Sequence, residues 1–163
     1  CNEADCGMSC DSCREGGCDV PGCDGPGCEV DSSFVNTALD LVSVQVPSMD
    51  REHQECAVAL RALATQRSQN ALKAVLTCFV DHFSHEEALF EEFGFGNHKN
   101  EQFSAKKTHI EDHKRLLEKI RRQLEGPATV PAGFVRELLQ DFHEHTSRYD
   151  VQYSDLLASS GAS

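Results

Sequence analysis

The sequence has few positive charges and no long hydrophobic run. Lysine and arginine together number 15 against 27 acidic residues among 163, which gives a formal net charge of −12. This charge opposes binding to nucleic acid and to anionic lipid, because both partners are themselves negative. No stretch of 18 apolar residues occurs, which excludes a transmembrane helix, and no alternating pattern typical of a strand extends beyond the short run 41–46. We therefore expect an all-α protein that binds neither nucleic acid nor membrane.

The chain also lacks an initial methionine and starts at Cys1. We take it as a fragment or a processed form, so any targeting segment lies outside the sequence. We expect a cytoplasmic protein, with a membrane contact only if Cys1 carries a lipid.

Residues 1–33 have almost no apolar side chains of any size beyond Met8, Val20 and Val30. They hold seven of the nine cysteines and six of the eleven glycines, and eight acidic residues against one arginine give them a net charge of −7. Such a segment buries too little apolar surface to offset the entropy cost of ordering it. We predict a disordered or cross-linked tail over residues 1–33, followed by one domain over residues 34–163.

The tail cysteines recur every five residues from Cys13 to Cys28. They lack the paired CxxC spacing with downstream histidines that is typical of a zinc finger. Three alternatives are thiolate binding of a soft metal, a disulfide-linked cap in an oxidising compartment, and an unstructured redox sensor. We favour a role in metal binding or redox chemistry, and predict that the tail binds a soft metal without affecting the domain.

Residues 34–163 contain four amphipathic stretches of helical period, at about 49–66, 68–93, 104–125 and 131–158. The second ends at Gly94 and the third at Gly126, and Pro131 suits the first turn of the fourth. The connections are short except for 94–103. Short connections between long helices make neighbours antiparallel, which predicts an up-down-up-down four-helix bundle.

Each predicted helix carries histidine or carboxylate side chains in line with its apolar residues. His82 and Glu86 are four residues apart, as are His109 and His113, so each pair lies on one helix face. A lone histidine there is usually a hydrogen-bonded core residue, but burying five imidazoles and two carboxylates without a metal would be costly. We predict a metal site in the bundle, with seven candidate ligands: His53, His82, Glu86, His109, His113, His145 and Asp150.

The helical period does not settle the ligands of the fourth helix. At about 100° per residue, His145 and Asp150 lie roughly 140° apart and flank the apolar stripe. Either they straddle a metal pair from opposite edges, or a π-type turn between them brings them together. His143 lies at nearly the same angle as Asp150 and is an equally good candidate on spacing alone.

Four segments, MDREH (49–53), HFSHEE (82–87), HIEDH (109–113) and HTSRYD (145–150), resemble the hemerythrin family. The family pattern is His, then His with Glu four residues on, then His with His four on, then His with Asp five on. All seven positions are filled, in order, and the resemblance covers residues 34–158. It favours His145 over His143 as the ligand of the fourth helix.

The resemblance implies a non-haem diiron centre. His109, His113 and His145 would hold one iron, while His53 and His82 would hold the other. The two irons would be bridged by Glu86, by Asp150 and by an oxo or hydroxo oxygen from solvent. The second iron then lacks one ligand, and dioxygen would bind there.

Reversible dioxygen binding, for carriage, storage or sensing, is therefore the implied function. The alternative is a diiron redox enzyme or sensor acting on peroxide, nitric oxide or iron. An oxidase would be expected to have a carboxylate-rich ligand set, as in ferritin-like proteins. Here imidazoles outnumber carboxylates five to two, which favours the binding function.

Two residues depart from the family's oxygen carriers, which typically have aliphatic side chains at these positions. Phe142 and Thr146 should face the ligand pocket. A hydroxyl at Thr146 would donate to a bound ligand or admit water and speed autoxidation, so long-lived oxygen carriage is less secure than metal binding.

The remaining histidines and buried cysteines have simpler interpretations. We expect His85, Glu87 and His98 to be surface residues. Cys56 and Cys78 should point inward near the site as small apolar side chains.

Overall fold

The computed structural model describes residues 29–96 and 104–154, and these residues are helical with no strand among them. The predicted all-α class is confirmed. The helices are α1 (Ser32–Ala38), α2 (Pro47–Gln66), α3 (Gln69–Phe93), α4 (Ala105–Leu124) and α5 (Ala132–His145), and a π-helical turn η3 (Thr146–Asp150) continues α5. Residues 151–154 return to α-helix. The cysteine-rich part of the predicted tail, residues 1–28, lies outside the described residues, as do 155–158 of the last predicted helix.

The helix ends follow local sequence signals. Pro47 opens α2 two residues before the predicted start, at a position where its missing N–H is not needed. The side chains of Ser68 and Ser104 cap α3 and α4 by accepting hydrogen bonds from Ala71 N and Lys107 N. Gly94 ends α3 with a φ of 73°, a left-handed conformation that glycine adopts without strain.

Helix α1 was not among the predicted elements. Asp31 caps it by accepting from the backbone N–H groups of Ser33 and Phe34, and Val30 and Val35 are buried against the core. The last residues of the predicted tail therefore belong to the helical domain, because Val30, the Asp31 cap and the first turn of α1 all lie within residues 29–33. The following run 41–46, whose alternation resembled a strand, forms no strand and bends at Gln45, where φ is 60°. Asp50 holds it by accepting hydrogen bonds from Ser43 Oγ and Val44 N.

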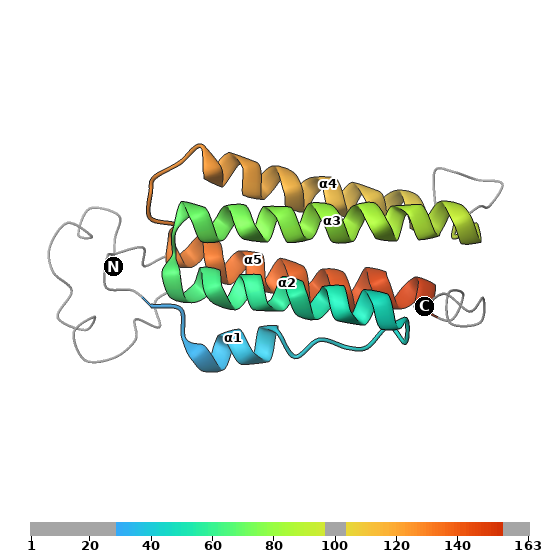
Figure 1. Ribbon diagram of the computed structural model, residues 1–163, viewed down its shortest axis with the longest axis horizontal. Coiled ribbons are helices and arrows are strands. Elements are labelled where there is room, and N and C mark those ends of the chain that lie inside the picture. Colours follow the sequence, from blue (N-terminus) through green and yellow to red (C-terminus); the bar gives the residue numbers. More distant parts are fainter. Residues whose placement is uncertain (1–28, 97–103, 155–163) are drawn as a thin grey trace, which may run out of the picture.

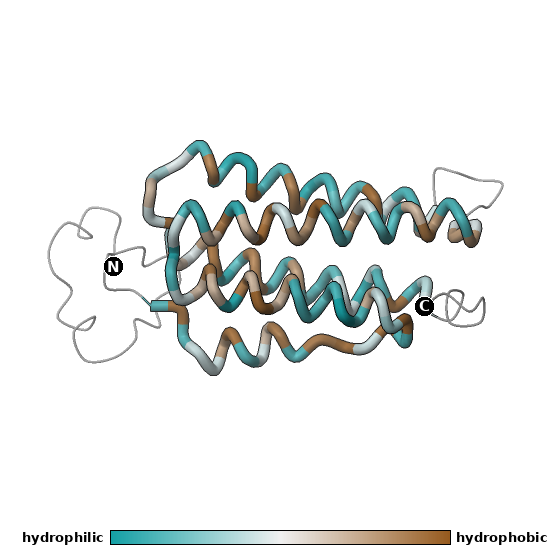
Figure 2. The backbone as a smooth tube through the Cα atoms, viewed as in Figure 1, coloured by the Kyte–Doolittle hydropathy of each residue, from teal (hydrophilic) through white to brown (hydrophobic). Residues whose placement is uncertain are grey.

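The four long helices lie side by side and successive ones run in opposite directions, with α1 alongside (Figure 1). Helix α2 contacts α3, α3 contacts α4, and α5 contacts α4 and α2, while α1 packs on α5. Apolar residues recur at intervals along each helix (Figure 2). None of the helices in the described ranges is long and apolar enough to cross a membrane.

The buried residues form two apolar clusters separated along the helices. The larger lies towards the loop that joins α2 to α3 and includes Leu60, Phe79 and Leu138. The smaller lies towards the other end and comprises Val44, Val46, Met49, Phe90, Phe95 and Tyr153. The level between the two clusters contains buried polar side chains, which form the site described next.

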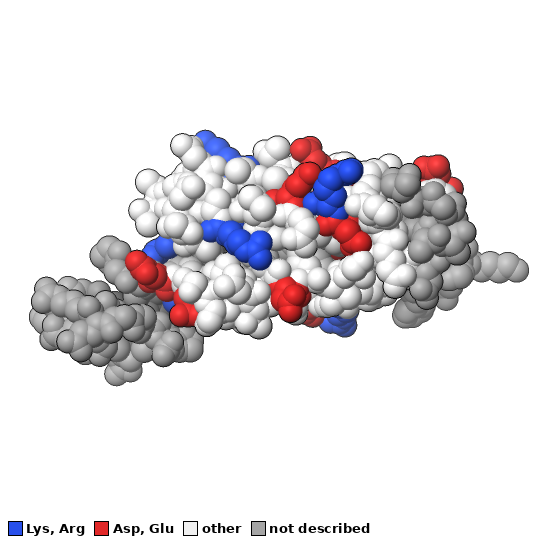
Figure 3. Space-filling view, turned by 60° about the horizontal axis from the view of Figure 1, so that its bottom comes forward, with Lys and Arg blue, Asp and Glu red and all other residues white. Residues whose placement is uncertain are grey.

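Acidic and basic side chains are intermingled on the face drawn in Figure 3, and much of that face carries neither. Between α4 and α5 the charges form ion pairs. Arg115 of α4 contacts Asp141 of α5 at 3.0 Å, and Lys119 of α4 contacts Asp141 and Glu137 of α5 at 2.7 and 3.0 Å. These contacts tie the outer edges of the two helices together.

Candidate metal centre

The structure brings all seven predicted ligands together at one level, from all four long helices. Helix α2 supplies one, α3 and α4 supply two each, α5 supplies one at its last residue, and η3 supplies one at its end. Every one of them is at most 1% exposed: His53, His82, Glu86, His109, His113, His145 and Asp150.

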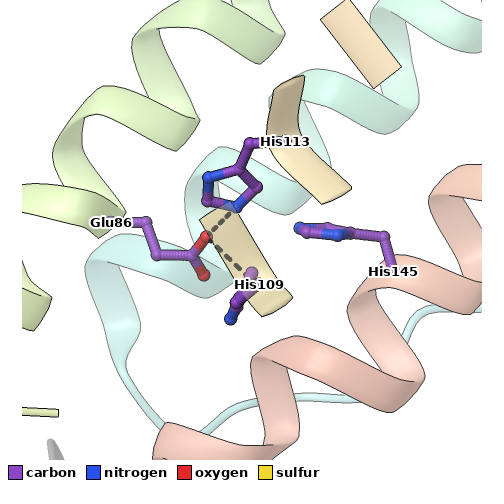
Figure 4. A group of neighbouring side chains, drawn as sticks. All are labelled: Glu86, His109, His113 and His145. Atoms are coloured by element: carbon purple, nitrogen blue, oxygen red, sulfur yellow. Dashed lines mark ion pairs between the residues drawn. The ribbon is translucent and has the colours of Figure 1, made fainter. Parts of the chain in front are cut away.

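Three histidines converge on Glu86 to form one half of the cluster (Figure 4). Glu86 Oε2 lies 2.8 Å from His113 Nε2 and 3.2 Å from His109 Nε2. The ring of His145 approaches from α5, 4.9 Å from the ring of His109 and 5.0 Å from that of His113. We call this group the three-histidine half.

His53 and His82 form the other half with Asp150, and we call it the two-histidine half. Their ring centroids are 4.7 Å apart. Asp150 joins the halves: its Oδ2 is 2.9 Å from His53 Nε2, while its Oδ1 is 3.0 and 3.1 Å from His109 and His145 Nε2. One carboxylate thus has one oxygen in each half.

The ligand atoms are close together without being hydrogen-bonded to one another. The Nε2 atoms of all five histidines and both oxygens of each carboxylate have no hydrogen-bond partner among the described residues. Around an ion with metal–ligand distances of about 2.1 Å, neighbouring ligand atoms of an octahedron lie about 3.0 Å apart. The observed separations of 2.8–3.2 Å match that edge, so the residues fit metal ions placed between them.

Carboxylates outside the cluster hold three of the five histidines by their other ring nitrogen. Glu52 lies 3.2 Å from His82 Nδ1. Two further contacts of this kind join His113 Nδ1 to Glu87 at 2.8 Å and His145 Nδ1 to Asp112 at 2.9 Å. Such partners fix the ring orientation and leave Nε2 free to ligate.

The sequence reasoning missed these outer carboxylates. Glu87 was expected to be a surface residue and is 39% exposed, yet it contacts a buried ligand. A signal was present, because each outer carboxylate is the immediate chain neighbour of a ligand: Glu52 precedes His53, Glu87 follows Glu86 and Asp112 precedes His113. In each case it supports a ligand on a different helix.

The π-helical turn brings His145 and Asp150 together, which is one of the two alternatives that the spacing allowed. Hydrogen bonds of the i→i+5 type spread five residues over a wider turn, so the two side chains converge. The hydroxyls of Thr146 and Ser147 both donate to the carbonyl of His143. Serine and threonine bonds of this kind bend helices and favour the wider turn here.

His143, the rival candidate, lies outside the cluster. Its Nδ1 is 3.1 Å from the carbonyl oxygen of Ala38, so it joins α5 to α1. Thr146 is fully buried, but its hydroxyl donates to a backbone carbonyl 3.2 Å away. In this structure the hydroxyl proton is therefore directed to the backbone rather than to a ligand pocket.

Aromatic rings enclose the cluster. Phe83 stacks on His113 at 4.0 Å, and Phe142 contacts His53 edge-on at 6.3 Å while stacking on Phe79 at 5.0 Å. All three phenylalanines are at most 2% exposed. They keep water away from both halves of the cluster.

The other predicted residues are placed as follows. His85 is 42% exposed, and its Nδ1 lies 2.7 Å from Glu52. Cys56 is buried, and burial raises the pKa of its thiol well above the ordinary value. Cys78 is half-buried against the larger apolar cluster, while His98 lies outside the described residues.

Charge pairing within the cluster outweighs burial. Burial lowers the pKa of His145, but the charge of Asp150, the hydrogen bond with Asp112 and the close approach of the Asp150 carboxylate raise that pKa to about 10. Burial also lowers the pKa of His109, but the neighbouring carboxylates of Asp150 and Glu86 raise it above its ordinary value. Burial alone would raise the pKa of Asp150, but His145 and His109 hold it well below its usual range.

Metal loading at pH 7 should therefore release a proton. His145, protonated in the metal-free chain, must lose a proton to ligate. The raised pKa of His145 stabilises the metal-free fold fully below about pH 6.5 and ceases to do so as the pH rises through about 10. Metal affinity should rise with pH over that interval. Titration calorimetry in two buffers of different ionisation enthalpy measures the release, and equal heats in both buffers would contradict it.

Comparisons with known proteins give no relative. No family model matches the chain, no curated protein matches it, and no solved structure matches it.

Proposed function

We propose that this chain belongs to the hemerythrin family and folds as an up-down-up-down four-helix bundle around a pair of iron ions that bind dioxygen reversibly. The observation that carries the proposal is the position of Asp150, with one oxygen in each half of the cluster. A carboxylate shared in this way is what two neighbouring metal ions require. Opposite running directions of successive long helices support the bundle topology.

The donor set supports iron. Imidazole and carboxylate together suit iron in both of its common oxidation states, whereas thiolates would favour softer metals. The two-histidine half has fewer protein donors than the three-histidine half. Iron ions held in the two halves would supply the electrons that dioxygen binding needs, and the half with fewer protein donors would leave room for dioxygen.

The chain's own residues would orient the ligands and exclude water. Glu52, Glu87 and Asp112 hold histidine rings so that Nε2 faces the cluster. Phe142 and Phe79 close the side next to His53. A dry, pre-oriented site favours reversible binding, because water and loosely held ligands promote irreversible oxidation.

The test is iron per chain together with the visible spectrum, recorded anaerobically after reduction and again after oxygen is admitted. We expect two irons, a colourless reduced form, and a charge-transfer band that appears with oxygen and vanishes on degassing. Two irons that pass directly to a stable oxidised spectrum would replace this proposal with the redox enzyme or sensor. Fewer than two irons at saturation would contradict the paired site.

The proposed binding of a soft metal by the tail concerns residues outside the described ranges. A chain beginning at Asp31 should lose the zinc or copper that the full chain takes up at the tail cysteines. Equal uptake by both chains would contradict tail binding.

A further inference from the structure

Tyr153 lies next to the metal cluster and is not one of its predicted ligands. It follows η3 by three residues and is fully buried. Its ring packs against Phe90 at 5.2 Å, against Phe95 at 6.0 Å, and flat on His109 at 5.9 Å with an interplanar angle of 18°. It is therefore held on three sides within the smaller apolar cluster.

The phenol hydroxyl of Tyr153 has no hydrogen-bond partner among the described residues. The surrounding cluster consists otherwise of apolar side chains, such as Met49 and Phe90. A phenylalanine would fill the same space without burying an unpaired hydroxyl, which is unfavourable for folding. A buried polar group of this kind calls for a partner in another state of the molecule.

Glu86 is the nearest candidate for that partner. It is one helical turn before Phe90, which Tyr153 contacts, and its Oε2 lies 3.2 Å from Nε2 of His109, on which Tyr153 stacks. After burial, the negative charge of Glu86 is the strongest influence on the Tyr153 hydroxyl, and both raise its pKa far above the ordinary value. Tyr153 is thus a neutral donor beside an acceptor.

A carboxylate can accept about four hydrogen bonds or metal contacts through the lone pairs of its two oxygens. Neither oxygen of Glu86 receives a well-formed hydrogen bond among the described residues, and the Tyr153 hydroxyl lies close enough to this carboxylate for their interaction to contribute to the raised pKa of the tyrosine. A metal ion would use one lone pair on each oxygen that it binds, and the remaining lone pairs of the carboxylate could still accept a hydrogen bond. A donor at that point would hold the carboxylate in its ligating orientation.

We propose that Tyr153 is a positioning residue of the metal centre, whose hydroxyl donates a hydrogen bond to the Glu86 carboxylate when metal is bound. The inference rests on the part of the proposed function that places metal in the cluster. It does not depend on which metal is bound or on dioxygen.

The test compares Tyr153→Phe with the unaltered full-length chain, using Co²⁺ as the probe metal. The metal-free variant should melt at the same or a higher temperature, because an unpaired buried hydroxyl has been removed. It should bind Co²⁺ roughly 10- to 100-fold more weakly, the range expected for losing a hydrogen bond to a charged group. The visible absorption of bound Co²⁺ should also shift, because Glu86 is less well held.

Tyr149→Phe is the matched control. Tyr149 also contacts the ring of His109, at 5.5 Å, and stacks on His145, but it is only half-buried. Its substitution should leave Co²⁺ affinity and spectrum unchanged. A merely structural role for Tyr153 would lower the melting temperature of the metal-free and loaded forms alike.

Three results would overturn the proposal. One is wild-type Co²⁺ affinity and spectrum in Tyr153→Phe, which would leave the metal site itself intact. Another is a loss of stability in the metal-free variant equal to that in the loaded one, which would mean that the hydroxyl serves the fold. The last is failure of the unaltered chain to bind Co²⁺, which would remove the metal site and the inference together.

Discussion

His145→Ala should leave the chain unable to hold two metal ions, while His143→Ala should retain both. His145 Nε2 belongs to the three-histidine half and also lies 3.1 Å from Asp150, the shared carboxylate. His143 faces α1 instead. Both substitutions replace a histidine of α5 by alanine, and the two positions are only two residues apart. A difference between the variants therefore reports the position of the histidine and not the type of change. Metal analysis after loading and gel filtration gives the number of ions per chain.

His145→Ala and His143→Ala should also differ in the free energy of unfolding of the metal-free chain. Removing one partner of a buried ion pair destabilises a fold by about 3–5 kcal/mol, and His145 pairs with both Asp150 and Asp112. His143→Ala loses only a hydrogen bond to a carbonyl, which contributes about 1 kcal/mol. His113→Ala should behave like His145→Ala. Full iron content in His145→Ala with loss in His143→Ala would move the ligand assignment to His143.

Glu52→Gln and Glu87→Gln should each weaken metal binding in one half of the cluster only. Glu52 supports His82, which is in the two-histidine half, and Glu87 supports His113, which is in the three-histidine half. Loss of such an outer carboxylate typically reduces metal affinity by about 10- to 100-fold. The amide is a weaker acceptor than the carboxylate, and when it donates to Nδ1 it stabilises the tautomer that cannot ligate through Nε2.

An anaerobic ferrous titration with a competing chelator measures the two binding constants separately. We expect Glu52→Gln to lower the constant of the two-histidine half and Glu87→Gln to lower the other, so each variant is the control for its counterpart. Both glutamates are partly exposed, at 20% and 39%, so an amide of the same size should leave the fold intact. Equal weakening of both constants by either variant would argue against separate support of the two halves.

The positions of the candidate ligands on α3 and α4 could be predicted because the sequence follows the helical period there. His82 and Glu86, like His109 and His113, are four residues apart on a regular helix, and that spacing alone aligns them. Both pairs do lie in the cluster. The helix ends near Pro47 and Gly94 were also signalled by residues whose backbone preferences are strong.

The placement of Asp150 could not be predicted from the helical period. The period assumes an α-helix, and the π-helical turn over Thr146–Asp150 breaks it. Helix α1 could not be predicted for a different reason. It has seven residues, too few for a period to be distinct, and its stability comes from packing on α5 and from the Asp31 cap.

The outer carboxylates were missed because spacing within a helix cannot report contacts between helices. Glu87 points away from the Glu86 face of its own helix, which makes it look like a surface residue. Only the approach of α4 gives it a buried partner in His113.

The wider turn after His145 fixes the number of residues that must separate His145 from the side chains that follow it. One residue more or fewer in a helix rotates all later side chains about the helix axis by about 100°. The positions of Asp150 and Tyr153 therefore both depend on the number of residues in the π-helical turn. A deletion between His145 and Asp150 would move the shared carboxylate and the buried phenol in a single event. The five-residue interval and the tyrosine three residues later should thus be inherited together, and can identify distant relatives of this chain when little else in their sequences is alike.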